Sequence, residues 1–182
     1  IIDATAIVIA KHGLAAATTA RITDEVGISI GSLYQYFDNK EDLYEAVLER
    51  IVEKLITLVD KQTLTKEPVT LSVWVTTLLN DVWDYLAADN GLYLQVVRNW
   101  SQMDFISGMD ALEQKMHSVL SVYLLQQPTR ISHNTGDLPA RLYILTNSIL
   151  FTLLRYISKP SPLVSRQSLI AEFARMVERS LL

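Results

Sequence analysis

The chain has 182 residues, of which 49% are hydrophobic and 20% charged, with a formal net charge of −4 and no cysteine. The absence of cysteine excludes disulfides, thiolate chemistry and cysteine-ligated metal centres, and it is compatible with a cytoplasmic location. No uncharged run reaches the roughly 18 residues of a membrane-spanning helix, and no signal peptide is visible, so no membrane association is predicted.

Residues 1–45 are predicted to form a compact DNA-binding domain of three short helices. The first helix, residues 1–12, is amphipathic. Thr18 and Thr19 are N-cap candidates for the second helix, because a threonine hydroxyl can accept a hydrogen bond from the unpaired N–H groups of a first turn. Gly27 is expected to end this helix, since glycine readily takes the left-handed backbone conformation found after helix C-termini.

A third helix is predicted over residues 30–37, with Ser29 as its N-cap. The apolar residues that we expect to face the core are Ile30, Leu33 and Phe37. Asn39 and Asp42 are three residues apart, a spacing typical of paired caps at the start of a helix. The next helix is therefore expected to begin within this pair, with Asp42 in its first turn.

The opposite side of the third helix carries small, hydrogen-bonding and phenolic side chains without charge. Such a helix can enter the major groove of DNA, which is about 12 Å wide. Gly31 allows close approach of the backbone, and Gln35 suits adenine, which presents a donor and an acceptor side by side. Lys40, in the first turn of the next helix, suits a phosphate. The predicted DNA-contacting residues are Thr19, Ser29, Gly31, Ser32, Tyr34, Gln35, Tyr36 and Lys40.

The stretch GISIGSLYQYFDNKEDL, residues 27–43, resembles the helix-turn-helix signature of the TetR family of bacterial transcription regulators. The matching positions are Gly27, Ser29, Gly31, Leu33, Tyr34, Tyr36, Phe37, Lys40, Glu41 and Leu43. The resemblance extends over residues 1–49, although Asp24 and Glu25 depart from the small or neutral residues often found before the glycine. It implies an all-helical homodimer that binds operator DNA.

The charge of the N-terminal part argues against DNA binding. Residues 1–50 contain four Lys or Arg and eight Asp or Glu, whereas residues 51–182 contain twelve of each kind. Neutralisation of phosphates by basic groups supplies most non-specific affinity for DNA. Two points soften this argument: Asp42, Glu45 and Glu49 are expected to face away from DNA, and any basic N-terminal arm lies outside this sequence. A different function is the alternative.

Residues 46–182 are predicted to form a helical effector-binding and dimerisation domain. A continuous helix over residues 41–61, with apolar residues at three- and four-residue spacing, is expected to tie this domain to the N-terminal one. Further helices are predicted over residues 69–88, 92–100, 108–126, 139–157 and 165–182. No strand pattern or repeat is visible, so the predicted fold class is all-α.

The predicted helix over residues 139–157 is apolar on nearly all sides and must be covered on two of them. Either it is the central helix of a single core, or a second copy of the chain covers it. The family resemblance implies that this helix and the helix over residues 165–182 pair with their mates in a four-helix bundle. The predicted dimer-interface residues are Ile149, Phe151, Leu154, Phe173, Met176 and Val177.

Aromatic and methionine side chains gather between residues 74 and 123. Apolar walls with a few polar groups are typical of small-ligand pockets, and methionine adapts to varied ligand shapes. Alternatively, these side chains only fill the core; the resemblance implies a pocket, whereas the pattern merely permits one. The predicted effector-contacting residues are Trp74, Leu78, Trp83, Tyr93, Trp100, Met103, Phe105, Met116, Tyr123 and Asn147.

Catalytic and metal-binding patterns are weak. Asp110, Glu113 and His117 have the helical spacing of a metal clamp, but a solvated surface pair explains them better. The sequence has no glycine-rich phosphate loop, no nucleophile elbow and no Cys/His metal spacing. No catalytic residue, cofactor or metal is therefore predicted.

The predicted function is a dimeric DNA-binding transcriptional repressor that a small apolar or aromatic molecule releases from a palindromic operator. The ligand is expected to favour a state whose two recognition helices are mis-spaced for successive major grooves. A DNA-binding regulator without an effector and a small helical enzyme are the alternatives. The operator, the effector and the direction of regulation are left open by the sequence.

Overall fold

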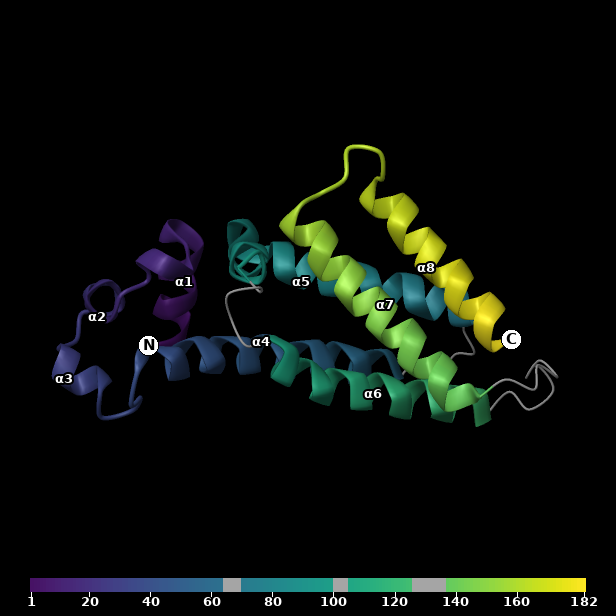
Figure 1. The fold of residues 1–182 in the computed structure, drawn as a ribbon, viewed down its shortest axis with the longest axis horizontal. Coiled ribbons are helices and arrows are strands. Elements are labelled where there is room, and N and C mark those ends of the chain that lie inside the picture. Colours follow the sequence, from purple (N-terminus) through teal and green to yellow (C-terminus); the bar gives the residue numbers. More distant parts are fainter. Residues whose placement is uncertain (64–69, 100–104, 126–136) are drawn as a thin grey trace. The chain divides into compact units, whose positions relative to one another are not determined.

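A computed structural model describes residues 1–63, 70–99, 105–125 and 137–182. These parts of the chain are helical and contain no strand, which confirms the predicted all-α class (Figure 1). None of their helices is long and apolar enough to cross a membrane. The elements are α1 (Ile2–His12), the 3₁₀ turn η1 (Leu14–Ala16), α2 (Thr19–Val26), α3 (Ile30–Leu33), α4 (Lys40–Thr63), α5 (Leu71–Val97), α6 (Phe105–Leu125), α7 (Leu138–Ser158) and α8 (Arg166–Leu181).

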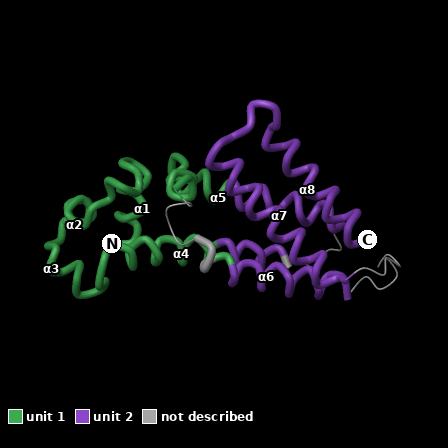
Figure 2. Tube along the Cα trace, in the orientation of Figure 1, with its two compact units in different colours: residues 1–54, 84–109 green, residues 55–83, 110–182 purple. Residues whose placement is uncertain are grey.

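The chain forms two compact units (Figure 2). Unit 1 consists of residues 1–54 and 84–109, and unit 2 consists of residues 55–83 and 110–182. Both α4 and α5 therefore contribute residues to each unit. Unit 1 contains the predicted DNA-binding domain together with further parts of α4 and α5.

The N-terminal helices of unit 1 begin and end where local sequence signals place them. The Thr18 hydroxyl accepts a hydrogen bond from the Arg21 N–H at 3.4 Å at the start of α2. Gly27 ends α2 with φ 78° and ψ 35°, the left-handed conformation. Aliphatic side chains from α1 to α4 form the core beneath. Its fully buried members include Val8, Ile9, Ile22, Leu33, Leu43, Val47 and Ile51.

The third helix is shorter than predicted. α3 spans Ile30–Leu33, and residues 34–36 form a turn instead of continuing the helix. Leu33 is completely buried, as expected, but Ile30 is 46% exposed, so the prediction that Ile30 faces the core was wrong. Ile30 is the first residue after the N-cap of a one-turn helix, and it has no preceding helical turn to cover it.

Tyr44 links α4 to the end of η1, just before α2. It is buried, and its hydroxyl donates a hydrogen bond to the Ala17 carbonyl oxygen at 2.6 Å. Burial, and to a smaller extent the Glu41 carboxylate, raises the pKa of Tyr44, so the phenol remains a donor at neutral pH. We expect Tyr44→Phe to lower the free energy of unfolding by about 1 kcal/mol, because this hydrogen bond is lost. Urea denaturation measures the change.

The control for this prediction is Tyr36→Phe. Tyr36 is 73% exposed and makes no side-chain hydrogen bond to the rest of the described chain, so the same substitution should leave the unfolding midpoint unchanged. Equal losses in the two variants would contradict the role assigned to the Tyr44–Ala17 hydrogen bond.

The break predicted between the helices over residues 69–88 and 92–100 is present as a kink within α5. Asp89, Asn90 and Gly91 take left-handed backbone conformations, with φ of 51°, 59° and 76°. Tyr85 and Tyr93 lie on either side of the kink, with ring centroids 5.1 Å apart. Burial, followed by the interaction with Tyr93, raises the pKa of Tyr85, which stays protonated.

In unit 2, α7 and α8 lie side by side (Figure 1). The Arg141 guanidinium of α7 donates to the Ser180 carbonyl oxygen of α8 at 2.9 Å. At the other end of α8, the Arg166 guanidinium donates to Asn80 Oδ1 at 2.9 Å and lies 5.1 Å from the centroid of the Trp83 ring. These contacts hold α8 against α7 and α5.

Candidate DNA-binding face and buried cavity

The predicted DNA-contacting residues all lie in unit 1 and reach solvent. Tyr36 is 73% and Tyr34 47% exposed. The exposed members of the set are Ser29, Gly31, Tyr34, Gln35, Tyr36 and Lys40, and the half-buried ones are Thr19 and Ser32. We call the surface formed by these eight residues the α3 face.

Two serines of the α3 face form hydrogen bonds within α3, whereas the longer side chains of this face form none. Ser29 Oγ accepts the Ser32 N–H at 3.0 Å and lies 2.9 Å from Ser32 Oγ. By contrast, Tyr34, Gln35 and Tyr36 make no side-chain hydrogen bond within the described ranges. These three residues can therefore hydrogen-bond a partner without breaking an interaction of the fold.

Gly31 has no structural reason to be glycine. Its φ is not positive, and a Cβ atom built there would approach only Ser29 Oγ, at 3.7 Å, an ordinary contact. Gly27 differs, because its φ of 78° disfavours any side chain. A methyl group at Gly31 is therefore compatible with the fold of the described chain.

The start of α4 carries the predicted pair of caps. Asn39 Oδ1 accepts the Asp42 N–H at 3.0 Å, and Asp42 Oδ2 accepts the Asp38 N–H at 3.0 Å. Lys40 Nζ lies 3.6 Å from Glu41. Both side chains are exposed, and such a pair contributes little to stability, so Lys40 can exchange Glu41 for a phosphate.

The acidic residues of unit 1 are partly paired. Lys11 Nζ lies 3.0 Å from Glu25, and Arg50 forms an ion pair with Asp3. Pairing leaves the net charge unchanged and, with the Lys40–Glu41 pair, engages three of the four basic residues within residues 1–50. A nucleic acid bound at the α3 face would be held largely by hydrogen bonds and shape, with fewer phosphate neutralisations than a basic domain would make.

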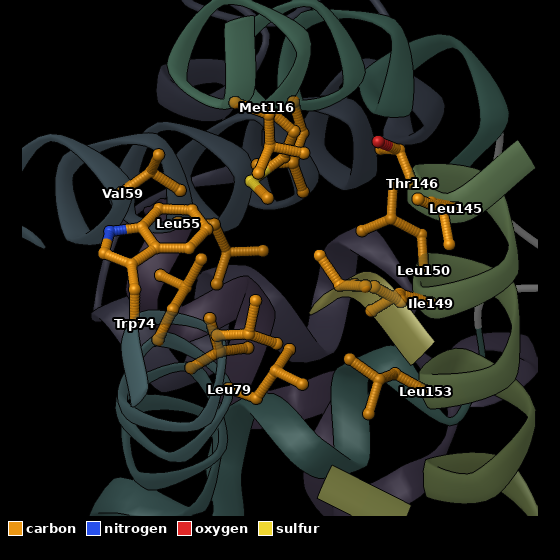
Figure 3. A pocket seen from close by; sticks show the side chains of 16 residues that line it. Leu55, Val59, Trp74, Leu79, Met116, Leu145, Thr146, Ile149, Leu150 and Leu153 are labelled. Carbon is orange, nitrogen blue, oxygen red and sulfur yellow. The ribbon is translucent and has the colours of Figure 1, made fainter. Parts of the chain in front are cut away.

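Unit 2 contains an apolar cavity of about 70 Å³ (Figure 3). Side chains from α4, α5, α6, α7 and α8 form its walls, and Trp74 and Met116 approach it from α5 and α6. Its lining residues are Leu55, Val59, Trp74, Val75, Leu78, Leu79, Val82, Leu112, Met116, Leu120, Leu145, Thr146, Ile149, Leu150, Leu153 and Val177. None of these residues carries a charge.

Thr146 is the polar exception in this wall. It is 3% exposed, and its hydroxyl has no hydrogen-bond partner among the described residues. A buried hydroxyl that is left unpaired costs about 1–3 kcal/mol. The fold tolerates this cost at a cavity, where an incoming molecule can supply the missing partner.

The sequence predicted part of this cavity. Trp74, Leu78 and Met116 line it, whereas Trp83, Tyr93, Tyr123 and Asn147 do not. Trp100 and Met103, and the side chain of Phe105, fall outside the described parts of the structure. The prediction that this set contacts an effector stays a prediction.

The predicted residues away from the cavity have other contacts. The Trp83 ring lies 5.8 Å from that of Tyr156, and Tyr93 packs against Tyr85 in unit 1. Asn147 Nδ2 donates to Glu113 Oε2 at 2.8 Å. In the described part of the chain, no group of three His, Cys, Asp or Glu side chains could hold a metal ion.

The remaining lining residues are aliphatic and were missed because leucine and valine fill ordinary cores as well. A stretch rich in aromatic residues indicates an apolar core, but it does not show which side of each helix faces the cavity. The sequence did not single out Thr146 either, because Asn147, Ser148 and Thr152 lie close to it on α7.

The predicted dimer-interface residues are mostly internal to the protomer. Phe151 is 38% exposed and Met176 is half-buried, whereas Leu154 and Phe173 are buried in unit 2. Ile149 and Val177 line the cavity. The exposed apolar residues of α7 that the sequence pattern did not single out are Tyr143, at 56%, and Ile144, at 62%.

Comparison with known proteins supports a relationship to bacterial regulators. Residues 1–47 match the family described as bacterial regulatory proteins, tetR family. A fatty acid metabolism regulator protein of Bacillus subtilis (strain 168) is 27% identical over 124 residues, which is 68% of this chain and 60% of the relative. The chain thus spans less than two thirds of that curated relative.

Solved structures share the fold over nearly the whole chain. The fatty acid degradation regulator FadR from Bacillus halodurans is 18% identical with a TM-score of 0.73, covering 100% of this chain and 97% of that one. The transcriptional regulator FadR from Bacillus subtilis, solved in complex with stearoyl-CoA, is 19% identical with a TM-score of 0.71, covering 99% and 95%. At these identities the likeness concerns the fold.

Proposed function

We propose that this chain is a regulator of the TetR type, a dimeric repressor that an apolar molecule releases from a palindromic operator; the match of residues 1–47 to the tetR family and the shared fold support this proposal. The observation that carries this proposal is the apolar cavity of unit 2, in a chain whose unit 1 presents the α3 face. The helices α4 and α5 contribute to both units, so a displacement at the cavity can change the position of the α3 face.

An apolar ligand fits the cavity walls. The similar regulator from Bacillus subtilis was solved with stearoyl-CoA, and the curated relative is named for fatty acid metabolism. A cavity of about 70 Å³ is too small for a long acyl chain. A longer ligand must displace wall side chains, and Met116, Leu150 and Leu153, each only half-buried, are suited to move.

Exposed apolar side chains on α7 support the proposed dimer. Tyr143, Ile144 and Phe151 are 56%, 62% and 38% exposed. Phe151 follows the adjacent residues Tyr143 and Ile144 by eight and seven positions, about two helical turns, so the three lie on one side of α7. In a protein that binds a palindromic DNA site as a dimer, a second copy of the chain would pack against these exposed apolar residues. Two α3 faces about 34 Å apart would address successive major grooves.

Ile144→Glu is expected to weaken the dimer by at least about tenfold, because it places a charge in an apolar interface. The control is Val122→Glu on α6, which changes a residue of similar exposure, 51%, outside α7. Sedimentation velocity over a range of concentrations measures both variants. A dimer unaffected by Ile144→Glu would exclude this side of α7 as the interface.

Selection from a pool of random duplex DNA at two salt concentrations, followed by sequencing, tests the proposed function as a whole. Recovery of a palindrome with half-sites about one turn apart supports a dimeric reader. Binding that is blind to sequence, or no binding, would refute it. A regulator without an effector would select the palindrome but show no thermal stabilisation by apolar compounds, since a bound ligand raises stability by mass action.

A further inference from the structure

We infer that the effector carries one neutral oxygen, as a hydroxyl or a carbonyl group, on an otherwise aliphatic body, and that Thr146 is the residue that recognises this oxygen. The inference rests on the proposed function, because it takes the unit 2 cavity as the effector site. It adds the chemical class of the ligand and the residue that selects it.

Thr146 differs from the other buried threonines of the described chain. The hydroxyl of Thr5 donates to the Ile1 carbonyl oxygen at 3.1 Å, and that of Thr23 donates to the Thr19 carbonyl oxygen at 3.0 Å. Both thus use the preceding turn of their own helix, which is the usual solution for a buried threonine. Thr146 is as deeply buried as Thr23, yet its hydroxyl makes no such bond.

Water does not readily satisfy this hydroxyl. A buried water molecule needs two to four polar partners, and Thr146 is the one hydrogen-bonding hydroxyl in a wall that is otherwise made of hydrocarbon, a thioether and an indole. Figure 3 shows the Thr146 side chain among these apolar side chains. A molecule that brings its own hydrocarbon body and one oxygen matches the wall better than water does.

The same wall excludes a charged group at this point. No lysine, arginine, histidine, aspartate or glutamate is among the lining residues, so a carboxylate, phosphate or ammonium placed there would lose its hydration without gaining a counter-ion. A threonine hydroxyl can both donate and accept. It therefore suits an alcohol, which does the same, and a carbonyl oxygen, which accepts.

The test uses six-carbon probes that differ only in their polar group: hexane, 1-hexanol, 2-hexanone and hexanoate. Calorimetry and thermal shift measure their binding to the full chain, and release from the selected DNA is followed in parallel. We expect 1-hexanol and 2-hexanone to bind about two- to tenfold more tightly than hexane, as for one neutral hydrogen bond, and hexanoate more weakly than either.

Three variants separate recognition from a structural role. Thr146→Val should abolish the preference for the oxygenated probes and raise the melting temperature of the unliganded protein, because the unpaired hydroxyl is removed. Thr146→Ser keeps the hydroxyl and should keep the preference. Thr77→Val is the control, because Thr77 is exposed on α5 and donates to the Val73 carbonyl oxygen, and it should change neither quantity.

The possible failures are distinguishable. If hexane binds as tightly as 1-hexanol, or if Thr146→Val keeps the preference, the inference about Thr146 is overturned while an apolar effector stands. If none of the four probes binds the protein or releases DNA, both the inference and the proposed effector response are overturned.

Discussion

Gly31→Ala is expected to weaken binding to the selected operator by about tenfold or more while leaving the fold intact or slightly more stable. The added Cβ makes only an ordinary contact within the chain, 3.7 Å from Ser29 Oγ. Removing the backbone freedom of glycine from a helix raises the free energy of unfolding by about 0.5–1 kcal/mol. The methyl group instead meets a closely approaching DNA surface, and a tenfold loss there corresponds to about 1.4 kcal/mol.

The matched control is the same substitution at the other glycine of the motif. Gly27 has φ of 78°, so Gly27→Ala should destabilise the fold by about 1–2 kcal/mol. Urea denaturation of the two variants should show an unchanged or higher stability for Gly31→Ala and a lower stability for Gly27→Ala. DNA titration measures the operator affinity of both. Normal operator affinity in a stable Gly31→Ala protein would show that α3 does not approach DNA at this residue.

Leu150→Phe is expected to abolish the response to an apolar effector, with a loss of at least about tenfold in ligand affinity, while operator binding without ligand is retained. Leu150 projects into the cavity from α7 (Figure 3). A phenyl ring would fill much of the cavity, whose volume is about 70 Å³, and leave little space for a ligand. The existing void limits the overpacking cost, which is otherwise about 1–3 kcal/mol.

The control for cavity filling is Leu163→Phe. Leu163 is 91% exposed in the loop between α7 and α8 and does not line the cavity, so the same exchange should leave ligand affinity unchanged. Ligand titration monitored by release of fluorescent operator DNA measures both variants. A Leu150→Phe protein that still releases DNA at the wild-type ligand concentration would place the effector site elsewhere.

These two predictions concern the two sites that the proposed mechanism couples, the α3 face that binds DNA and the cavity that binds the effector. A ligand changes DNA affinity only by as much as its own affinity differs between the DNA-binding and released states. A tenfold release therefore requires about 1.4 kcal/mol of differential binding. Gly31→Ala alters the DNA end without touching the cavity, and Leu150→Phe alters the cavity without touching the α3 face.

The sequence by itself determined the features that depend on a few neighbouring residues. The Thr18 and Ser29 caps, the left-handed Gly27 and the Asn39–Asp42 pair were all predicted and are all present. Each is set by hydrogen bonds or backbone sterics within about four residues, so local sequence is sufficient. The all-helical class follows from apolar periodicity for the same reason.

Tertiary structure decided what depends on which sides of distant helices meet. The cavity draws residues from five helices. Trp74 lines it, whereas Trp83 and Tyr93, which aromatic content along the chain grouped with Trp74, pack elsewhere. The unpaired hydroxyl of Thr146 is likewise invisible in the sequence, because most buried threonines bond their own helix. Side-chain direction and the closure of a shared space are long-range properties, and only the packed structure shows them.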